Sequence, residues 1–309
     1  MKTFSWRTAL LGKYDVFHVH WPEILVNGHS PLKKIVRQAL TLGLILRLRI
    51  FRTPLVRTVH NVEVPQDISR RERLLLRLLD KATTLRIRLN STTPIPAGEP
   101  FRTIPHGHYR DWFAPFTPQN QVSGQIGYIG LIRRYKGVEE LVRAFRGTRH
   151  VADDISLRLA GNPTSEALAD SIRSAAQGDN RIHLDLRFIS DEDLVGVITS
   201  SELVVLPYRL MHNSAGVLTS LSLGRPVLVP DNEVNRRLSD EVGPGWVFLF
   251  EGPLTSEHLI RTLAGLRAAG PRPEPNLKGR EWGSAGVDHL GAYRQAMERS
   301  RPRRPGPPA

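Results

Sequence analysis

Short apolar runs alternate with amphipathic helical patterns along most of this chain. Such alternation is typical of a parallel β-sheet covered by helices on both faces, so the predicted fold class is α/β. The expected strands are Val16–Val19, Leu55–Val59, Leu85–Leu89, Gln125–Ile129, Ser156–Ala160, Ile182–Leu186, Leu203–Leu206, Pro226–Val229 and Val247–Phe250. The expected helices are Leu32–Ile50, Arg70–Lys81, Gly137–Arg146, Ser165–Ala176, Asp191–Ser200, Gly216–Leu223, Ser256–Ala268 and Glu281–Glu298.

A polar, turn-rich segment with the sequence FTPQNQVSG interrupts this pattern before a new strand begins. We therefore expect two Rossmann-like domains, over residues 1–118 and 119–278. A further helix over 279–299 has apolar residues at helical spacing and must pack on one of them. The Pro- and Arg-rich segment 300–309 cannot build a core and is predicted to be disordered.

Composition excludes several classes of function. The chain has no cysteine, which excludes disulfides, thiolate catalysis and cysteine-ligated metals. We find no signal peptide and no membrane span, which favours a cytoplasmic protein. The net charge of +13 fits nucleic acid, anionic lipid or a diphosphate-bearing substrate. A specific nucleic-acid partner is not expected, because the sequence has no recognition helix, zinc knuckle or RNP aromatic pair.

The helical segment Leu32–Arg52 has two interpretations. Its basic residues could place it on an anionic membrane surface. Alternatively, its apolar residues cover the sheet while its charges are solvated, and we favour this second interpretation. The basic residues are Lys33, Lys34, Arg37, Arg47, Arg49 and Arg52.

The segment GYIGLIRRYKGVEELVRAF carries the strongest local signal. A strand ends at Gly130, a loop carries Arg133 and Lys136, and Gly137 opens an amphipathic helix. Such a loop can place two cations beside a diphosphate, with helix N-terminal amides to assist. The alternative is a basic loop that is merely solvated.

A second segment, SELVVLPYRLMHNSAGVLTSLSLGRPVLVPDN, runs from a strand through a loop into a helix. Small residues at the start of that helix would let phosphate oxygens approach backbone N–H groups, and we assign this use to Asn213, Ser214 and Gly216. An ordinary β-α-β crossover with an N-cap serine would show the same pattern.

Polar and aromatic residues follow two strands of the first domain. His20, Trp21 and Glu23 come after one strand, and His60 and Asn61 come after the next. Ligand sites of open α/β sheets lie beyond the carboxyl ends of the strands, so these side chains should point toward one cleft.

His106, in the segment TIPHGHYRDWF, is a further binding candidate near the end of the first domain. A metal site is not expected, because no H-x-x-x-H helix or carboxylate cluster accompanies these histidines.

In content and in order, these segments resemble GT-B glycosyltransferases, most closely bacterial exopolysaccharide mannosyltransferases. The resemblance implies two domains facing across a cleft, with the last helix crossing back to the first domain. It implies that Arg133 and Lys136 hold the donor diphosphate and that His60 lies near the transferred sugar. The implied donor-binding residues are Gly130, Arg133, Lys136, His212, Asn213, Ser214, Gly216 and Thr219, and the implied acceptor-side residues are His20, Trp21, Glu23, Asn61 and His106.

The sequence departs from this family pattern in two places. Many relatives carry two glutamates in the second donor segment, where this chain has Met211 and Thr219. His212 and Asn213 are then the nearest polar substitutes for sugar contact. Relatives also begin with an additional strand and a glycine-rich loop, so the first domain is expected to be shortened at its start.

The function implied by the resemblance is transfer of a hexose, of mannose or glucose type, from a UDP- or GDP-sugar to a glycan or lipid-linked acceptor in polysaccharide biosynthesis. Retention of configuration by front-face displacement is expected, with charge stabilisation from Arg133 and Lys136 and with no cofactor or metal. The enzyme would be cytoplasmic or peripheral at the inner face of the membrane. The alternative is a catalytically inactive GT-B homologue that acts as a binding or partner subunit.

Overall fold

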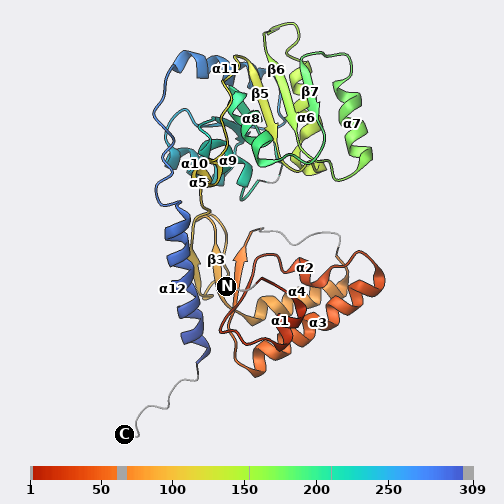
Figure 1. Cartoon of the computed structure of the whole chain (residues 1–309), viewed down its shortest axis with the longest axis vertical. Coiled ribbons are helices and arrows are strands. Elements are labelled where there is room, and N and C mark those ends of the chain that lie inside the picture. Colours follow the sequence, from red (N-terminus) through yellow and green to blue (C-terminus); the bar gives the residue numbers. More distant parts are fainter. Residues whose placement is uncertain (1–2, 61–67, 153, 210, 302–309) are drawn as a thin grey trace. The chain divides into compact units, whose positions relative to one another are not determined.

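The chain forms two compact units (Figure 1). Unit 1 comprises Met1–His106 and Trp282–Ala309, and unit 2 comprises Gly107–Glu281. Unit 1 is therefore built from both ends of the sequence. The computed structural model describes residues 3–60, 68–152, 154–209 and 211–301. The predicted acceptor-side residue Asn61 and most of the predicted disordered tail lie outside these ranges.

Four parallel strands form the sheet of unit 1, in the order β1-β2-β3-β4. Because the strands are parallel, their carboxyl ends share one edge of the sheet. The strands are β1 (Phe17–Val19), β2 (Leu55–Val59), β3 (Thr83–Arg88) and β4 (Phe101–Thr103). The helices of this unit are α1 (Trp6–Leu11), α2 (Glu23–Val26), α3 (Pro31–Ile50), α4 (Arg70–Ala82) and α12 (Trp282–Ser300).

Each face of this sheet has its own apolar core, because successive side chains of a strand point to opposite faces. Figure 1 shows α12 on one side of the strands and α1 to α4 on the other. On the α12 side, Val56 of β2 packs with three alanines of the helix, Ala285, Ala292 and Ala296. On the other side, Leu55 packs with residues of α3 and α4. The predicted return of the last helix to the first domain is thereby confirmed.

Unit 2 contains a six-stranded parallel sheet in the order β10-β9-β8-β5-β6-β7. The strands are β5 (Gln125–Ile129), β6 (Ser156–Ala160), β7 (Ile182–Asp185), β8 (Leu203–Val205), β9 (Val227–Pro230) and β10 (Val247–Phe250). The helices are α5 (Arg110–Phe113), a 3₁₀ turn η1 (Arg134–Lys136), α6 (Val138–Arg146), α7 (Glu166–Ala176), α8 (Asp191–Ser200), α9 (Ala215–Ser222), α10 (Glu233–Val242) and α11 (Ser256–Ala269).

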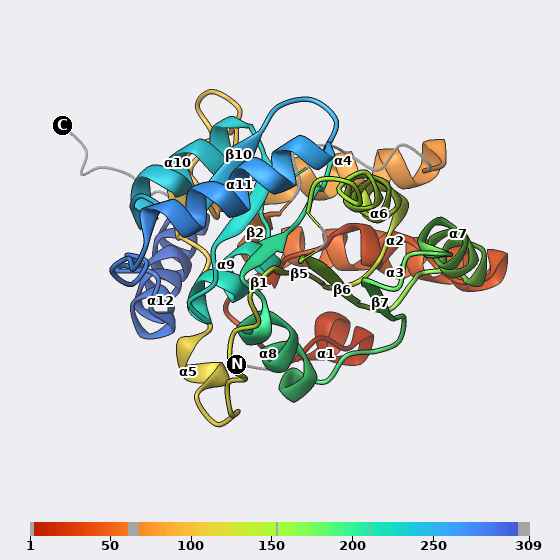
Figure 2. The same cartoon turned by 90° about the horizontal axis from the view of Figure 1, so that it is seen from above.

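Helices cover both faces of the sheet in unit 2. Figure 2 shows α6 and α11 on one side of this sheet and α8 on the other. The central strand β8 is fully buried, as expected for a parallel strand with both faces covered. Serines at the N-caps of α7, α8 and α9 accept a hydrogen bond from a backbone N–H of the first turn, which fixes where these helices begin.

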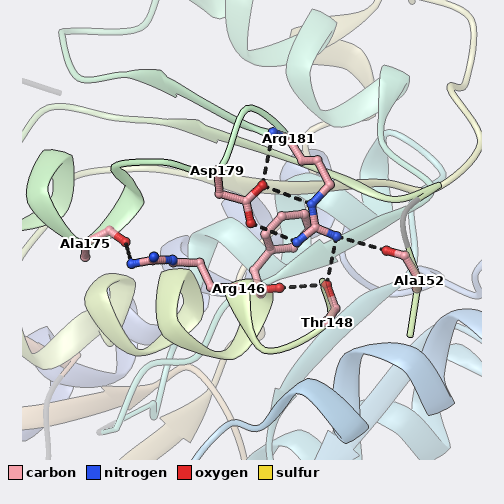
Figure 3. A network of polar contacts seen from close by, with 7 residues as sticks. Arg146, Thr148, Ala152, Ala175, Asp179 and Arg181 are labelled. Carbon is pink, nitrogen blue, oxygen red and sulfur yellow. Dashed lines mark hydrogen bonds and ion pairs between the residues drawn. The ribbon is translucent and has the colours of Figure 1, made fainter. Parts of the chain in front are cut away.

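A buried ion pair anchors the amino ends of two strands in unit 2 (Figure 3). Arg181 directly precedes β7 and pairs with Asp179 at 2.8 Å. It also donates hydrogen bonds to Thr148 Oγ1 and to the carbonyl oxygen of Ala152, just before β6. The hydrogen bond from Arg181 holds the pKa of Asp179 below its ordinary value. Because ligands bind beyond the carboxyl ends of such strands, we interpret this network as structural.

The structure contains elements that the sequence patterns did not predict. The short helices α1, α2 and α5, the strand β4 and the helix α10 were all missed. Strand β4 has three residues, one of them Arg102, and α10 has few apolar positions, so neither produces a strong periodic signal.

The favoured interpretation of α3 is wrong in part. Residues such as Leu44 and Leu48 do cover the core, but the opposite side of the helix exposes six large apolar side chains. Among the described residues, no helix combines the length and hydropathy needed to cross a bilayer.

Candidate active site

Glycines shape the loop that follows β5. Gly130 and Gly137 have φ angles of 115° and 67°, a left-handed region that favours glycine. A Cβ at Gly137 would lie 2.4 Å from the carbonyl oxygen of Pro207, and one at Gly161 would lie 2.0 Å from the carbonyl oxygen of Gly130. The loop is therefore packed backbone to backbone against the ends of β6 and β8.

The two donor segments predicted from the sequence lie side by side in unit 2. The backbone N–H of Arg209 donates to the carbonyl oxygen of Tyr135 at 3.0 Å. The ammonium of Lys136 lies 4.6 Å from the centroid of the Tyr208 ring, a cation–π contact. The segment after β5 and the segment after β8 thus form one surface.

Four residues converge at this surface, and we call them the donor cradle: Gly130, Lys136, Tyr208 and Gly216. A Cβ at Gly130 would lie 3.7 Å from Lys136 Nζ and 3.7 Å from the Tyr208 hydroxyl oxygen. A Cβ at Gly216 would lie 3.5 Å from the same hydroxyl oxygen. Gly130 therefore leaves room for a small group beside a cation and a hydroxyl group, both of which can interact with a phosphate oxygen.

Burial weakens the hydration of the Lys136 cation. Burial first, and the nearby Arg133 guanidinium second, lower the pKa of this ammonium to about 8. Arg133 itself is exposed and occupies the N-cap of η1. At neutral pH, Lys136 is still mainly protonated, so the cradle carries a poorly hydrated positive charge that an anionic ligand can neutralise.

The start of α9 supplies backbone amides beside the cradle. Ser214 Oγ accepts a hydrogen bond from the Val217 N–H at 3.3 Å, so its side chain serves as the helix cap. The N–H groups of Ala215 and Gly216 belong to the first turn, which has no intrahelical acceptor for them. The backbone of this segment, rather than the serine hydroxyl, is suited to phosphate oxygens.

The other predicted donor residues, and Met211 in place of a glutamate of the relatives, lie on this helix or in the loop before it. Met211 is buried, and its carbonyl oxygen accepts a hydrogen bond from Asn232 Nδ2. Thr219 is buried on α9. His212 and Asn213 are partly buried in the loop before the helix, and burial lowers the pKa of His212.

Histidines from two strand ends meet in unit 1. His20 Nδ1 and His60 Nε2 are 3.0 Å apart, so one ring donates a hydrogen bond to the other. The Trp21 ring stacks on His60 at a centroid distance of 4.4 Å and an interplanar angle of 13°. The sequence prediction that residues after β1 and β2 point to one place is therefore correct for His20, Trp21 and His60.

The histidine cluster extends to α12. His18 Nδ1 lies 2.8 Å from the Tyr293 hydroxyl oxygen, and His18 Nε2 lies 2.8 Å from Thr58 Oγ1. The His18 ring lies 4.3 Å from that of His20 and 5.8 Å from that of His289. We use the name histidine cluster for His18, His20, His60 and His289.

Burial favours the neutral form of the His18, His20 and His60 imidazoles. Burial first, and the neighbouring histidines second, lower the pKa of His18 to about 3 and that of His60 to about 4. Burial also lowers the pKa of His20, with His289 as the second cause. A neutral imidazole can accept a hydrogen bond from a hydroxyl group, which a protonated one cannot do.

Two predicted acceptor-side residues lie outside this cluster. Glu23 is partly buried at the first position of α2. The His106 ring meets the Trp282 ring edge to face at 5.7 Å. Within the part of the chain that the structure describes, no group of three or more histidine or acidic side chains is placed to hold a metal ion.

Sequence reasoning missed several members of both sites. His18 had a local signal, because it lies two residues before His20 and therefore on the same side of the strand. Tyr208 lies three residues after the end of β8, within the second donor segment, and could have been added to the predicted donor-binding residues. Tyr293 and His289 had no local signal, since only the packing of α12 brings them to the strands.

Two parallel-sheet units, with a cationic glycine loop after the first strand of the second unit, are the combination expected of a GT-B glycosyltransferase. The chain belongs to the group 1 glycosyltransferases: residues 123–266, which contain the donor cradle, match the family described as "Glycosyl transferases group 1". The protein is therefore a nucleotide-sugar-dependent glycosyltransferase.

The curated relatives include a GDP-mannose:glycolipid 4-beta-D-mannosyltransferase of Xanthomonas campestris pv. campestris. It is 43% identical over 295 residues, which cover 95% of this chain and 83% of the relative. The identity thus extends through both units.

Solved structures of low sequence identity share the fold. Sucrose-phosphate synthase from Thermosynechococcus elongatus superposes with a TM-score of 0.64 at 16% identity, over 92% of this chain and 74% of that one. An α,α-trehalose-phosphate synthase (UDP-forming) from Burkholderia vietnamiensis also gives 0.64, at 12% identity over 90% and 81% of the two chains. These likenesses confirm the predicted two-domain α/β fold.

Proposed function

We propose that this enzyme transfers mannose from GDP-mannose to a lipid-linked glycan. The observation that carries the proposal is the 43% identity, over 95% of this chain, to an enzyme named as a GDP-mannose:glycolipid mannosyltransferase. The donor cradle supports it physically, because it offers a cation and backbone amides where a nucleoside diphosphate would need them.

In the proposed reaction, the donor cradle binds the diphosphate of GDP-mannose. Lys136 and Arg133 stabilise the negative charge that develops on the leaving GDP, and the first-turn amides of α9 assist. The poor hydration of Lys136 strengthens this interaction, since less solvation is lost when the phosphate arrives.

His60 is the proposed general base or hydrogen-bond acceptor for the acceptor hydroxyl. Its pKa of about 4 leaves the ring neutral at physiological pH. The hydrogen bond with His20 and the stacked Trp21 fix the orientation of the ring. His20 and Trp21 are thus positioning residues in this proposal, while Glu23, Asn61 and His106 remain predicted acceptor-side residues.

Whether the reaction inverts or retains the anomeric configuration depends on the linkage in the product. The mannosyl–phosphate bond of GDP-mannose is α, whereas the name of the relative specifies a β-linked product. A β product from this chain would require inversion, in place of the retention that the resemblance implied. Inversion needs a base on the face opposite the leaving phosphate, and His60 is our candidate. The anomeric configuration of the product decides between the two outcomes.

We further propose that the enzyme works at the cytoplasmic face of a membrane, where a lipid-linked acceptor is held. No cofactor beyond the nucleotide sugar and no metal is included in the proposal. The large positive charge of the chain is consistent with an anionic surface as well as with an anionic donor.

The decisive experiment incubates the purified chain with GDP-mannose, UDP-glucose or UDP-galactose and a glycolipid acceptor. We expect GDP release and mannosylated lipid with GDP-mannose only, and a thermal shift with GDP. Equal turnover of a UDP-sugar would overturn the donor assignment. Binding of GDP with neither hydrolysis nor transfer would instead favour the inactive homologue, for which the buried Met211 in place of a glutamate is the supporting observation.

A further inference from the structure

The outer side of α3 is apolar although it faces solvent. Its exposed positions recur at helical spacing over 19 residues, opposite the side that packs into the core through Leu44, Ile45 and Leu48. The large apolar side chains on this side are between 48% and 72% exposed. We call them, with the exposed Ala39, the apolar stripe: Leu32, Ile35, Val36, Ala39, Leu42, Leu46 and Ile50.

The helices of unit 2 do not share this feature. Among the described residues, none of the exposed large apolar side chains lies on α6, α7, α8, α9, α10 or α11. Isolated exposed apolar residues are normal on protein surfaces. A continuous row of them along one helix, about 27 Å long at 1.5 Å per residue, marks an interaction surface.

The charges beside the stripe are positive. Lys33 and Arg49 are exposed on α3, which contains no acidic residue, and Arg52 is exposed just beyond its end. The neighbouring helix α4 shows a basic outer side that consists mainly of Arg70, Arg73, Arg77 and Lys81.

The two acidic residues of α4 are neutralised within unit 1. Glu72 is buried and pairs with Lys34 at 2.8 Å. Asp80 pairs with Arg57 at 2.6 Å and with Arg86 at 2.9 Å. The outward charge of α3 and α4 is therefore positive.

The apolar stripe and the basic side of α4 face away from the sheet together. Both helices lie on the same side of the strands (Figure 1). Their inner sides contribute to one apolar cluster, which contains Leu44 and Leu48 of α3 and Leu79 of α4. Their outer sides must consequently lie on the same exposed layer of unit 1.

We propose that this layer docks on a bilayer containing anionic lipids, with α3 in the plane of the interface. The apolar stripe enters the boundary between headgroups and acyl chains, and the basic residues of α4 contact lipid phosphates. The positive charge of this layer favours an anionic bilayer over a second copy of the chain as the partner, because two such layers would bring like charges together. The inference deepens the proposed function, since it names the surface that would hold the enzyme near a lipid-linked acceptor.

The first test measures co-sedimentation of the full chain with vesicles of phosphatidylcholine, alone or mixed with phosphatidylglycerol. We expect binding to the anionic vesicles, weakened at high salt. The double variant Leu42→Ser/Leu46→Ser should weaken binding at least about tenfold. The control Val287→Ser/Leu290→Ser removes two exposed apolar side chains from α12 and should change binding less than about twofold. Equal loss in both double variants would overturn the proposal.

A second pair of matched double variants tests whether the basic residues of α4 are needed for binding. Arg73→Gln/Arg77→Gln should weaken binding to anionic vesicles, whereas Arg143→Gln/Arg261→Gln removes the same charge from exposed positions of α6 and α11 and should not. Equal binding of the wild type to neutral and anionic vesicles would overturn the assignment of anionic lipid.

Further measurements distinguish membrane docking from self-association of the chain and from damage to the fold or the donor site. A wild-type dimer in sedimentation experiments that becomes monomeric in Leu42→Ser/Leu46→Ser would identify the stripe as a protein interface and overturn the proposal. The thermal shift with GDP should be unchanged in this variant, which shows that the fold and donor site are intact. A wild type that binds vesicles but responds to no nucleotide sugar would contradict the proposed function while supporting the membrane surface.

Discussion

The donor cradle of unit 2 and the histidine cluster of unit 1 each hold a basic group whose pKa is lowered by burial. The consequences differ because the groups start from different ordinary values. With a pKa of about 8, Lys136 remains mainly a cation at pH 7, whereas His60, with a pKa of about 4, is neutral. Similar burial thus gives one unit a poorly hydrated charge suited to a diphosphate, and the other a neutral hydrogen-bond acceptor suited to a hydroxyl group.

The largest loss of activity is expected when the charge of Lys136 is removed. Lys136→Met should lower kcat/KM with GDP-mannose by about a thousandfold, because the charge on the leaving GDP loses its main partner. The control Arg134→Gln removes a cation from the exposed part of the same loop and should cost less than about threefold. Similar losses in the two variants, measured as GDP release, would show that the loop contributes only diffuse charge.

The second prediction tests the neutral imidazole of His60 as a general base. His60→Gln should lower kcat by about a hundredfold, the contribution typical of a general base, with little change in GDP binding. His183→Gln, at an exposed position of β7, is the control. A His60 variant that loses GDP affinity instead of kcat would contradict the assignment of this residue to the acceptor side.

A third prediction concerns the pH dependence of GDP binding. The ammonium is protonated below its pKa of about 8 and loses its proton above it, so GDP affinity should be constant below pH 8. Above pH 8 it should fall, by up to about tenfold per pH unit. Calorimetric titrations between pH 7 and 9 measure this profile. Lys136→Arg keeps its charge over the whole range, so a decline of equal steepness in that variant would assign the profile to another group.

The smallest effect is expected at the contact between His18 and α12. Tyr293→Phe removes the hydroxyl that lies 2.8 Å from His18 Nδ1. Loss of one partly buried hydrogen bond should lower the free energy of unfolding by about 1 kcal/mol. Urea denaturation measures the change, and it should leave GDP binding unaltered. A variant as stable as the wild type would show that water replaces the hydroxyl.

Local pattern predicted most of the fold and the residues of one of the two candidate sites. The strands β2, β5, β6 and β10 begin and end where the apolar runs do. The cations Arg133 and Lys136 were found because loop, glycine and helix are contiguous in the sequence. Strand β4 could not be predicted, since its three residues gain their conformation from pairing with β3.

For sites assembled from distant segments, the sequence predicted only some of the residues that meet. His20 and His60 could be paired from the rule that parallel strands end at one edge. Tyr293 lies 275 positions after His18, and nothing in the local sequence of either residue specifies their contact. The exposed apolar stripe was missed for a related reason, because periodicity shows that a helix has an apolar side but not which side faces the core.

The packing of α12 in unit 1 also affects how the protein folds during translation. Val56, Leu85, Ile87 and Ile104 leave the ribosome long before Ala285, Ala292 and Ala296, which cover them in the finished structure. Unit 2, being continuous, can fold during synthesis, whereas one face of the first sheet must wait for α12. Until α12 is made, that face exposes apolar side chains, and a premature stop codon before Trp282 would leave them permanently uncovered.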